Sequence, residues 1–124
     1  MAEIVEARRR ERDRLIGLAR GYVERLSRRL PVVAAAVVGS VARGDFNVWS
    51  DVDVIVVVDE LPTRAPDRGS VLSADAPPGV QAIGFTPHEF REALTAGNPL
   101  AREASEVGVV LRGDGFFRLT HEGG

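Results

Sequence analysis

Two aspartates separated by one valine are the residues whose types and spacing could do chemistry together. Asp51 and Asp53 open an apolar run that continues to Val58. If this run is a β-strand, alternate side chains leave the same face, so the two carboxylates emerge side by side. Paired carboxylates are suitable ligands for Mg²⁺, which they usually share with phosphate oxygens. The pair therefore predicts a divalent-metal site at the start of the strand.

A glycine–serine turn precedes the aspartates. The apolar run 32–38 leads into Gly39-Ser40, and Arg43 follows three residues later. Gly39 would let the backbone approach a phosphate closely, and the Ser40 hydroxyl and nearby N–H groups would bind its oxygens. Arg43 could contact a phosphate or hold the loop through a carboxylate. Each residue also has a purely structural interpretation, with Ser40 as a helix cap and Arg43 as a surface residue.

The order of these residues matches a known signature. The chain reads Gly39-Ser40-Val41-Ala42-Arg43-Gly44, five further residues, then Ser50-Asp51-Val52-Asp53 and an aliphatic strand. It resembles the minimal nucleotidyltransferases of the DNA polymerase β superfamily, whose motif is GSxARGxxxxxSDxD. The resemblance implies an α+β fold, in which helices pack on a small mixed β-sheet and a long N-terminal helix leads into it.

The resemblance also implies an activity and a set of site residues. Members transfer a nucleoside monophosphate from a triphosphate, ATP or another, to a hydroxyl group with the help of Mg²⁺. On this chain Asp51 and Asp53 would be catalytic and would bind the metal. The nucleotide would be bound by residues of the same motif, namely Gly39, Ser40, Arg43 and Ser50.

One position departs from the family pattern. Active members generally carry a third carboxylate on the next strand, and alignment through the segment 86–90 places Gln81 there. Glutamine cannot take a proton and is a poor Mg²⁺ ligand. Asp75 would replace it only if its loop folded inward, which we do not expect. The protein is therefore either a transferase that tolerates Gln81 or a degenerate module that binds nucleotide or protein.

A partner protein is a further implication of the resemblance. Small family members often pair with an all-helical toxin as the antitoxin half of a toxin–antitoxin system, and some modify that partner with AMP. This chain has 124 residues and offers no separate acceptor-binding domain. We expect a helical partner to supply the acceptor, and a homo-oligomer is compatible with the sequence.

Composition limits the other classes of function. The net charge is only −2, and no apolar run is long enough to cross a bilayer. We therefore expect no membrane association, little attraction to nucleic acid and a cytoplasmic location. The chain has no cysteine, so disulfides and thiolate metal sites are excluded, and every basic residue is arginine, so no lysine can anchor a phosphate.

The periodicity predicts a single domain, residues 1–124, with a helix over 1–30, a core over 32–111 and a tail over 112–124. In the helix the charged stretch 3–14 is interpreted as a solvated face with ion pairs such as Glu6–Arg10. The alternative is a basic arm for nucleic acid, which would bind with a steep salt dependence but lacks aromatic residues for base stacking.

Turn and cap signals divide the core. Strands are expected over 32–38, 51–59, 80–85 and 107–111, with a long Pro- and Gly-rich loop over 60–79. Thr86 and Asn98 are predicted to cap two short helices. Phe46 and Trp49 are expected to fold back over the site or the core, and Phe116-Phe117 to pack on the core.

Overall fold

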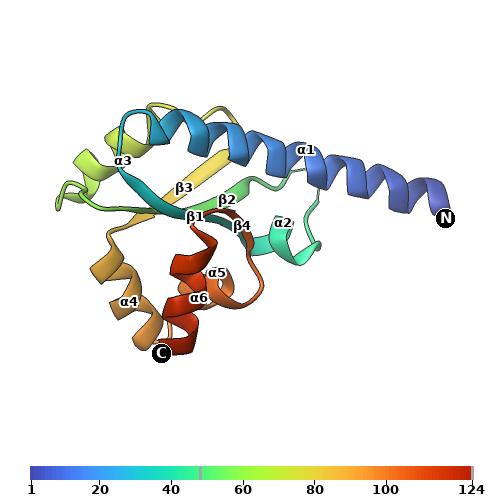
Figure 1. Cartoon of the computed structure of the whole chain (residues 1–124). Coiled ribbons are helices and arrows are strands. Elements are labelled where there is room, and N and C mark those ends of the chain that lie inside the picture. The colour runs from blue at the N-terminus through green and yellow to red at the C-terminus, as the bar shows by residue number, and fades with distance from the viewer. Residues whose placement is uncertain (48, 124) are drawn as a thin grey trace.

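The architecture is a four-stranded mixed sheet with helices on both faces, as a computed structural model that describes residues 1–47 and 49–123 shows (Figure 1). The strand order is β3-β2-β1-β4, with β1 antiparallel to both β2 and β4 and β3 parallel to β2. The strands are β1 (Val32–Val38), β2 (Val52–Val58), β3 (Val80–Phe85) and β4 (Val109–Arg112). The predicted α+β fold with a mixed sheet is confirmed.

Six helices are described in residues 1–47 and 49–123. They are α1 (Ala2–Ser27), α2 (Gly39–Arg43), α3 (Ala65–Ser73), α4 (Pro87–Thr95), α5 (Pro99–Glu106) and α6 (Asp114–Gly123). The long α1 lies along one face of the sheet, and α4, α5 and α6 gather on the other (Figure 1). The central strands β1 and β2 are buried on both faces, which explains their nearly continuous apolar sequences.

Each face of the sheet carries its own core. On one face α1 buries residues at helical spacing against alternate valines of β2; these residues are Leu15, Ala19, Tyr22, Val23 and Leu26. On the other face Phe90 of α4, Ala101 of α5 and Phe117 of α6 pack against Ile55 and Val57. The expected packing of Phe117 on the core is confirmed, since it is buried in this second cluster.

The first half of α1 extends past the sheet toward the side where α2 lies (Figure 1). Two of its arginines bind backbone carbonyls of the α2 region, Arg12 half-buried and Arg8 still exposed. Arg12 donates from Nε to the Val41 carbonyl at 2.8 Å, and Arg8 donates from Nη2 to the Phe46 carbonyl at 2.8 Å. The predicted ion pair also differs, because Glu6 binds Arg9 at 3.0 Å. The solvated interpretation of this stretch is therefore wrong for Arg12, whereas Arg8 binds its carbonyls while it stays exposed.

The segment 60–79 is the largest correction to the sequence analysis. It contains the helix α3, although a continuous loop was predicted. Proline lies in its first turn, where it costs no hydrogen bond, and Leu72 is buried against the α1 face of the sheet. The Tyr22 hydroxyl donates to the Leu72 carbonyl at 2.8 Å, so tertiary contacts support a helix in a sequence of weak helix formers.

Smaller differences concern element ends and one aromatic residue. Helix α1 ends at Ser27, before the predicted boundary at residue 30, and the tail predicted over 112–124 contains α6. The last strand is displaced to Val109–Arg112, because Val107 still closes α5 by donating its N–H to the Glu103 carbonyl. Phe46 is buried as expected, whereas Trp49 is 88% exposed and so does not fold back into the core.

The predicted caps are confirmed. Thr86 forms a capping box with Glu89, and the Asn98 side chain accepts two N–H bonds at the start of α5. Within the part of the chain that the structure describes, no helix has the length and apolarity needed to cross a membrane.

Candidate active site

The site residues meet where β1 ends and β2 and β3 begin. Asp53 lies opposite Val38 in the antiparallel pair and beside Gln81 in the parallel pair. Helix α2 starts directly after Val38, so its first residue, Gly39, lies next to Asp53. The register thus forms one row across the sheet, with Gln81 on one flank of Asp53 and the Gly39 turn on the other.

Gly39 and Asp53 fit together so closely that a side chain at position 39 would have to displace the Asp53 carboxylate. The backbone of Gly39 has φ +73°, a left-handed conformation, and a Cβ atom there would lie 2.6 Å from Asp53 Oδ2. The glycine therefore brings the main chain against a carboxylate of the predicted metal pair. The sequence analysis predicted that Gly39 lets the backbone approach a phosphate closely. The structure adds Asp53 as a second close neighbour of this glycine.

Negative charge accumulates around Asp53. Its pKa lies above the ordinary aspartate value, chiefly because the carboxyl is partly buried and also because Asp51 and Glu103 are nearby; Arg43 opposes the shift. Asp51 is exposed at the start of β2, and Asp53 is half-buried. A cation bound between them would relieve this repulsion.

The donor set fits a metal that the protein shares with its substrate. Two carboxylates with hard oxygen atoms match the usual protein contribution to a Mg²⁺ site, in which phosphate oxygens and water complete the coordination. No group of three or more His, Cys, Asp or Glu side chains that could hold an ion occurs in the described part of the chain. A cage made by protein alone is therefore not present among those residues.

Glu103, on α5, is a site residue that the sequence analysis missed. Its Oε1 accepts the Gly39 N–H at 3.1 Å and Arg43 Nη1 at 3.1 Å. Arg43 also donates from Nε to Asp45 at 3.3 Å, and both bonds contribute to raising the pKa of its guanidinium. Arg43 therefore holds the loop through carboxylates, one of the two roles that its sequence position allowed.

The two serines of the motif lie in different settings. Ser40 is half-buried, and its carbonyl accepts the N–H groups of Gly44 and Asp45, which closes α2. The Ser50 hydroxyl accepts the Asn47 N–H at 2.9 Å, so Ser50 ties the loop that leads into Asp51. Direct nucleotide contacts by either hydroxyl stay predictions.

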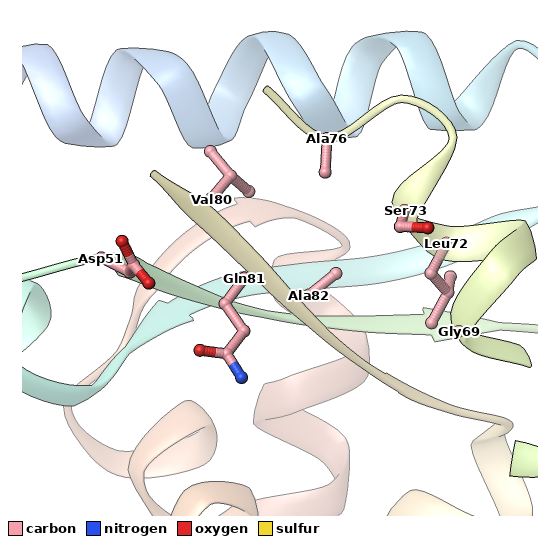
Figure 2. Close-up of a pocket in the computed structure, with 8 residues that line it drawn as sticks. All are labelled: Asp51, Gly69, Leu72, Ser73, Ala76, Val80, Gln81 and Ala82. Atoms are coloured by element: carbon pink, nitrogen blue, oxygen red, sulfur yellow. The ribbon is translucent and has the colours of Figure 1, made fainter. Parts of the chain in front are cut away.

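A pocket of about 330 Å³ opens beside Asp51 and Gln81. Figure 2 shows these two residues at one end of it and Leu72 and Ser73 of α3 at the other. Gln81 is exposed and pairs with Asp53 in the parallel register of β2 and β3. Asp75 does not replace it, because its carboxylate accepts a bond from Arg29 Nε at 2.8 Å at the end of α1.

With this geometry established, the comparisons with known proteins identify the family. The protein-family model for the nucleotidyltransferase domain matches residues 19–104. The chain belongs to this family. The matched stretch includes the aspartate pair, Gln81 and Glu103, so the whole row of site residues lies inside the nucleotidyltransferase domain.

A solved structure agrees with the family. The chain is similar to a candidate nucleotidyltransferase from Sulfolobus solfataricus, whose crystal structure was determined at 1.40 Å resolution. The two are 25% identical with a TM-score of 0.61, over 66% of this chain and 76% of the other. No curated protein matches the chain. The nucleotidyltransferase fold is therefore supported by both the sequence and the arrangement of its elements.

Proposed function

We propose that this nucleotidyltransferase domain binds a nucleoside triphosphate, ATP or another, together with Mg²⁺ and transfers the nucleoside monophosphate to a hydroxyl acceptor. The observation that carries the proposal is the placement of Asp51 and Asp53 beside the Gly39-Ser40 turn, within the stretch that matches the family. Both negative charges and backbone donors are thus available at one end of the sheet.

Each site residue has a proposed role in this reaction. Asp51 and Asp53 hold the metal, which when bound neutralises charge on the phosphates and on the attacking and leaving oxygens. Gly39, Ser40, Arg43 and Ser50 form the side of the site that takes the phosphates. The acceptor oxygen forms a bond to the α-phosphorus while the bond to pyrophosphate breaks. Because Gln81 cannot take the acceptor's proton, we assign that proton to water or to a substrate oxygen.

The second candidate is a degenerate module that binds nucleotide or protein without turnover. The exposed amide of Gln81 beside Asp53 favours it, since a neutral group occupies the position of the expected third carboxylate. In that case the protein acts by complexing a helical partner.

The partner that we propose in either case is an all-helical protein, toxin-like, with this chain as its antitoxin-like counterpart in the cytoplasm. A single unit over residues 1–124 provides the nucleotide site, and the partner provides the hydroxyl. The chain can also assemble as a homo-oligomer. Measurement of the molecular mass in solution, with and without the partner, distinguishes a homo-oligomer from a complex with the partner.

The decisive experiment is thermal unfolding with and without ATP and Mg²⁺. We expect ATP with Mg²⁺ to raise the melting temperature of the natural protein and to lose this effect in Asp51→Ala. Asp59→Ala is the matched control, because Asp59 is an exposed carboxylate just past the opposite end of β2. Stabilisation that persists in Asp51→Ala would contradict the proposed metal site.

Turnover then separates the two candidate functions. Transfer of AMP by the natural protein, abolished in Asp51→Ala, would reject the degenerate interpretation. Transfer that occurs only in Gln81→Asp would establish it, because the restored carboxylate can hold metal and accept a proton. The purified helical partner serves as the acceptor in this assay.

A further inference from the structure

The donors that the proposed function assigns to a phosphate already have an anionic partner inside the protein. The Gly39 N–H and Arg43 Nη1 both donate to one oxygen of Glu103, at 3.1 Å each. A carboxylate oxygen and a phosphate oxygen accept the same hydrogen bonds from backbone N–H groups and guanidinium groups. Glu103 therefore stands where a substrate phosphate would make its contacts.

From these contacts we propose that Glu103 is an internal competitor of the substrate's phosphate. Its carboxylate satisfies the Gly39 N–H and Arg43 in the free protein, and a phosphate must displace it to bind there. This inference rests on the proposed function, because it concerns the same phosphate contacts. It assigns Glu103 the role of setting the affinity of the site for polyphosphate anions.

The surroundings of Glu103 allow such a displacement. Its side chain is 20% exposed, so the carboxylate can reach solvent by rotation of the side chain without movement of α5. Arg43 keeps Asp45 as a second partner when Glu103 leaves. No buried cation is therefore stranded by the exchange.

The charges around Glu103 favour competition with the phosphate over a role in which Glu103 helps to bind it. Asp53 and Glu103 both place negative charge near the guanidinium of Arg43. A further anion entering this region meets repulsion while Glu103 is in place. Glu103 also does not join the aspartates as a third metal ligand, since no three such side chains among the described residues form a metal group.

A role for Glu103 as a fixed support of the turn predicts the opposite effect of its removal. If the carboxylate only held Gly39 in position, its loss would loosen the turn and weaken phosphate binding. If it competes, its loss frees two donors and strengthens phosphate binding. The sign of the change in affinity therefore distinguishes the two roles.

The experiment is isothermal titration of tripolyphosphate and of ATP with Mg²⁺ into the natural protein, Glu103→Gln and Glu103→Ala. We expect the dissociation constant for each ligand to fall about tenfold in both variants, as loss of one charge-assisted competitor implies. Glu106→Gln is the matched control, because it removes a charge one turn along α5 and should leave the constants unchanged. Thermal unfolding verifies that each variant is folded.

The amide resonance of Gly39 gives a readout that does not depend on affinity. In ¹⁵N-labelled natural protein this resonance should move on addition of tripolyphosphate, and in Glu103→Ala it should already be displaced before the ligand is added. Unchanged or weaker binding by both Glu103 variants would overturn the inference while the natural protein still binds ATP. Failure of every variant to bind ATP or tripolyphosphate would overturn the inference together with the proposed function.

Discussion

At the scale of single residues, the close approach of Gly39 to Asp53 is central to the proposed metal pair. Alanine at position 39 would suffer the left-handed φ of +73° and would push the Asp53 carboxylate from its place. We expect Gly39→Ala to lower the unfolding free energy by about 1–2 kcal/mol and to abolish stabilisation by ATP with Mg²⁺. Urea unfolding with and without the ligand measures both effects.

Gly44→Ala is the control for this prediction. Gly44 has φ +88° but nothing within 4 Å of its Cβ position, so alanine meets the backbone strain alone. Its loss of stability should be similar, about 1–2 kcal/mol, while the response to ATP with Mg²⁺ is retained. Equal loss of the ligand response in both variants would contradict the role assigned to Gly39.

Asp53 also gives the protein a pH dependence whose sign follows from its raised pKa. The folded protein holds the Asp53 proton more tightly than the unfolded chain, so this stabilisation is present at low pH. It is lost as the pH rises through the raised pKa, and ionised Asp53 destabilises the metal-free fold at neutral pH.

We therefore expect Asp53→Asn to be more stable than the natural protein at pH 7 in the presence of a chelator. The difference should vanish below about pH 3, where the carboxyl is protonated in both folded and unfolded states. Urea unfolding of the two proteins as a function of pH measures it. A difference that stays constant from pH 4 to pH 7 would disprove the assignment.

The sequence predicted the residues that the sheet register brings together, but it did not predict Glu103. Asp51, Asp53 and the Gly39 turn follow from local spacing, and Gln81 follows from alignment of the next strand. Glu103 contacts Gly39 across 64 positions, and no local spacing rule reaches that far. The available signal was its place on α5, between the inward-facing Ala101 and Ala104.

At the scale of elements, α1 supports the site by binding carbonyls of α2. Arg12 donates to Val41 and Ala42, at 2.8 and 2.9 Å. Replacing Arg12 by methionine keeps much of the apolar stem but leaves these carbonyls without their donors. We expect Arg12→Met to lower the unfolding free energy by about 1–3 kcal/mol and to weaken ATP binding, because α2 loosens.

The matched control for this prediction is Arg9→Met. Arg9 lies on the same helix and forms an exposed ion pair with Glu6, so its loss should cost less than about 1 kcal/mol. Denaturant titration of both variants provides the comparison. Equal losses would mean that the contacts of Arg12 with α2 add nothing to stability beyond an exposed ion pair.

Prediction of the elements succeeded where a pattern or a cap was local and failed where tertiary contacts decide. The apolar runs gave β1 and β2, and the capping box gave α4. The segment 60–79 offers only weak helix formers, yet α3 forms because Leu72 is buried under α1 and Arg68 binds Glu89 at 2.8 Å. Neither contact is visible in the local sequence.

At the scale of the whole molecule, the site lies between two layers, and each layer contributes to it. Helix α1 holds α2 from one face of the sheet, and α5 brings Glu103 to Gly39 from the other. The second layer depends on an aromatic cluster in which Phe90 is fully buried, with its ring centroid 5.8 Å from that of Phe85 and 5.6 Å from that of Phe117.

Truncation of one buried and one exposed aromatic residue tests how far the fold depends on this aromatic cluster. We expect Phe90→Ala to lower the unfolding free energy by about 3–5 kcal/mol, since it opens a cavity among α4, α5 and α6. Trp49→Ala removes a larger ring that is 88% exposed, so it should change the stability by less than about 0.5 kcal/mol. Urea unfolding of the two variants measures both. A cost of several kcal/mol for Trp49→Ala in the isolated protein would contradict its exposure and place the tryptophan in a core contact.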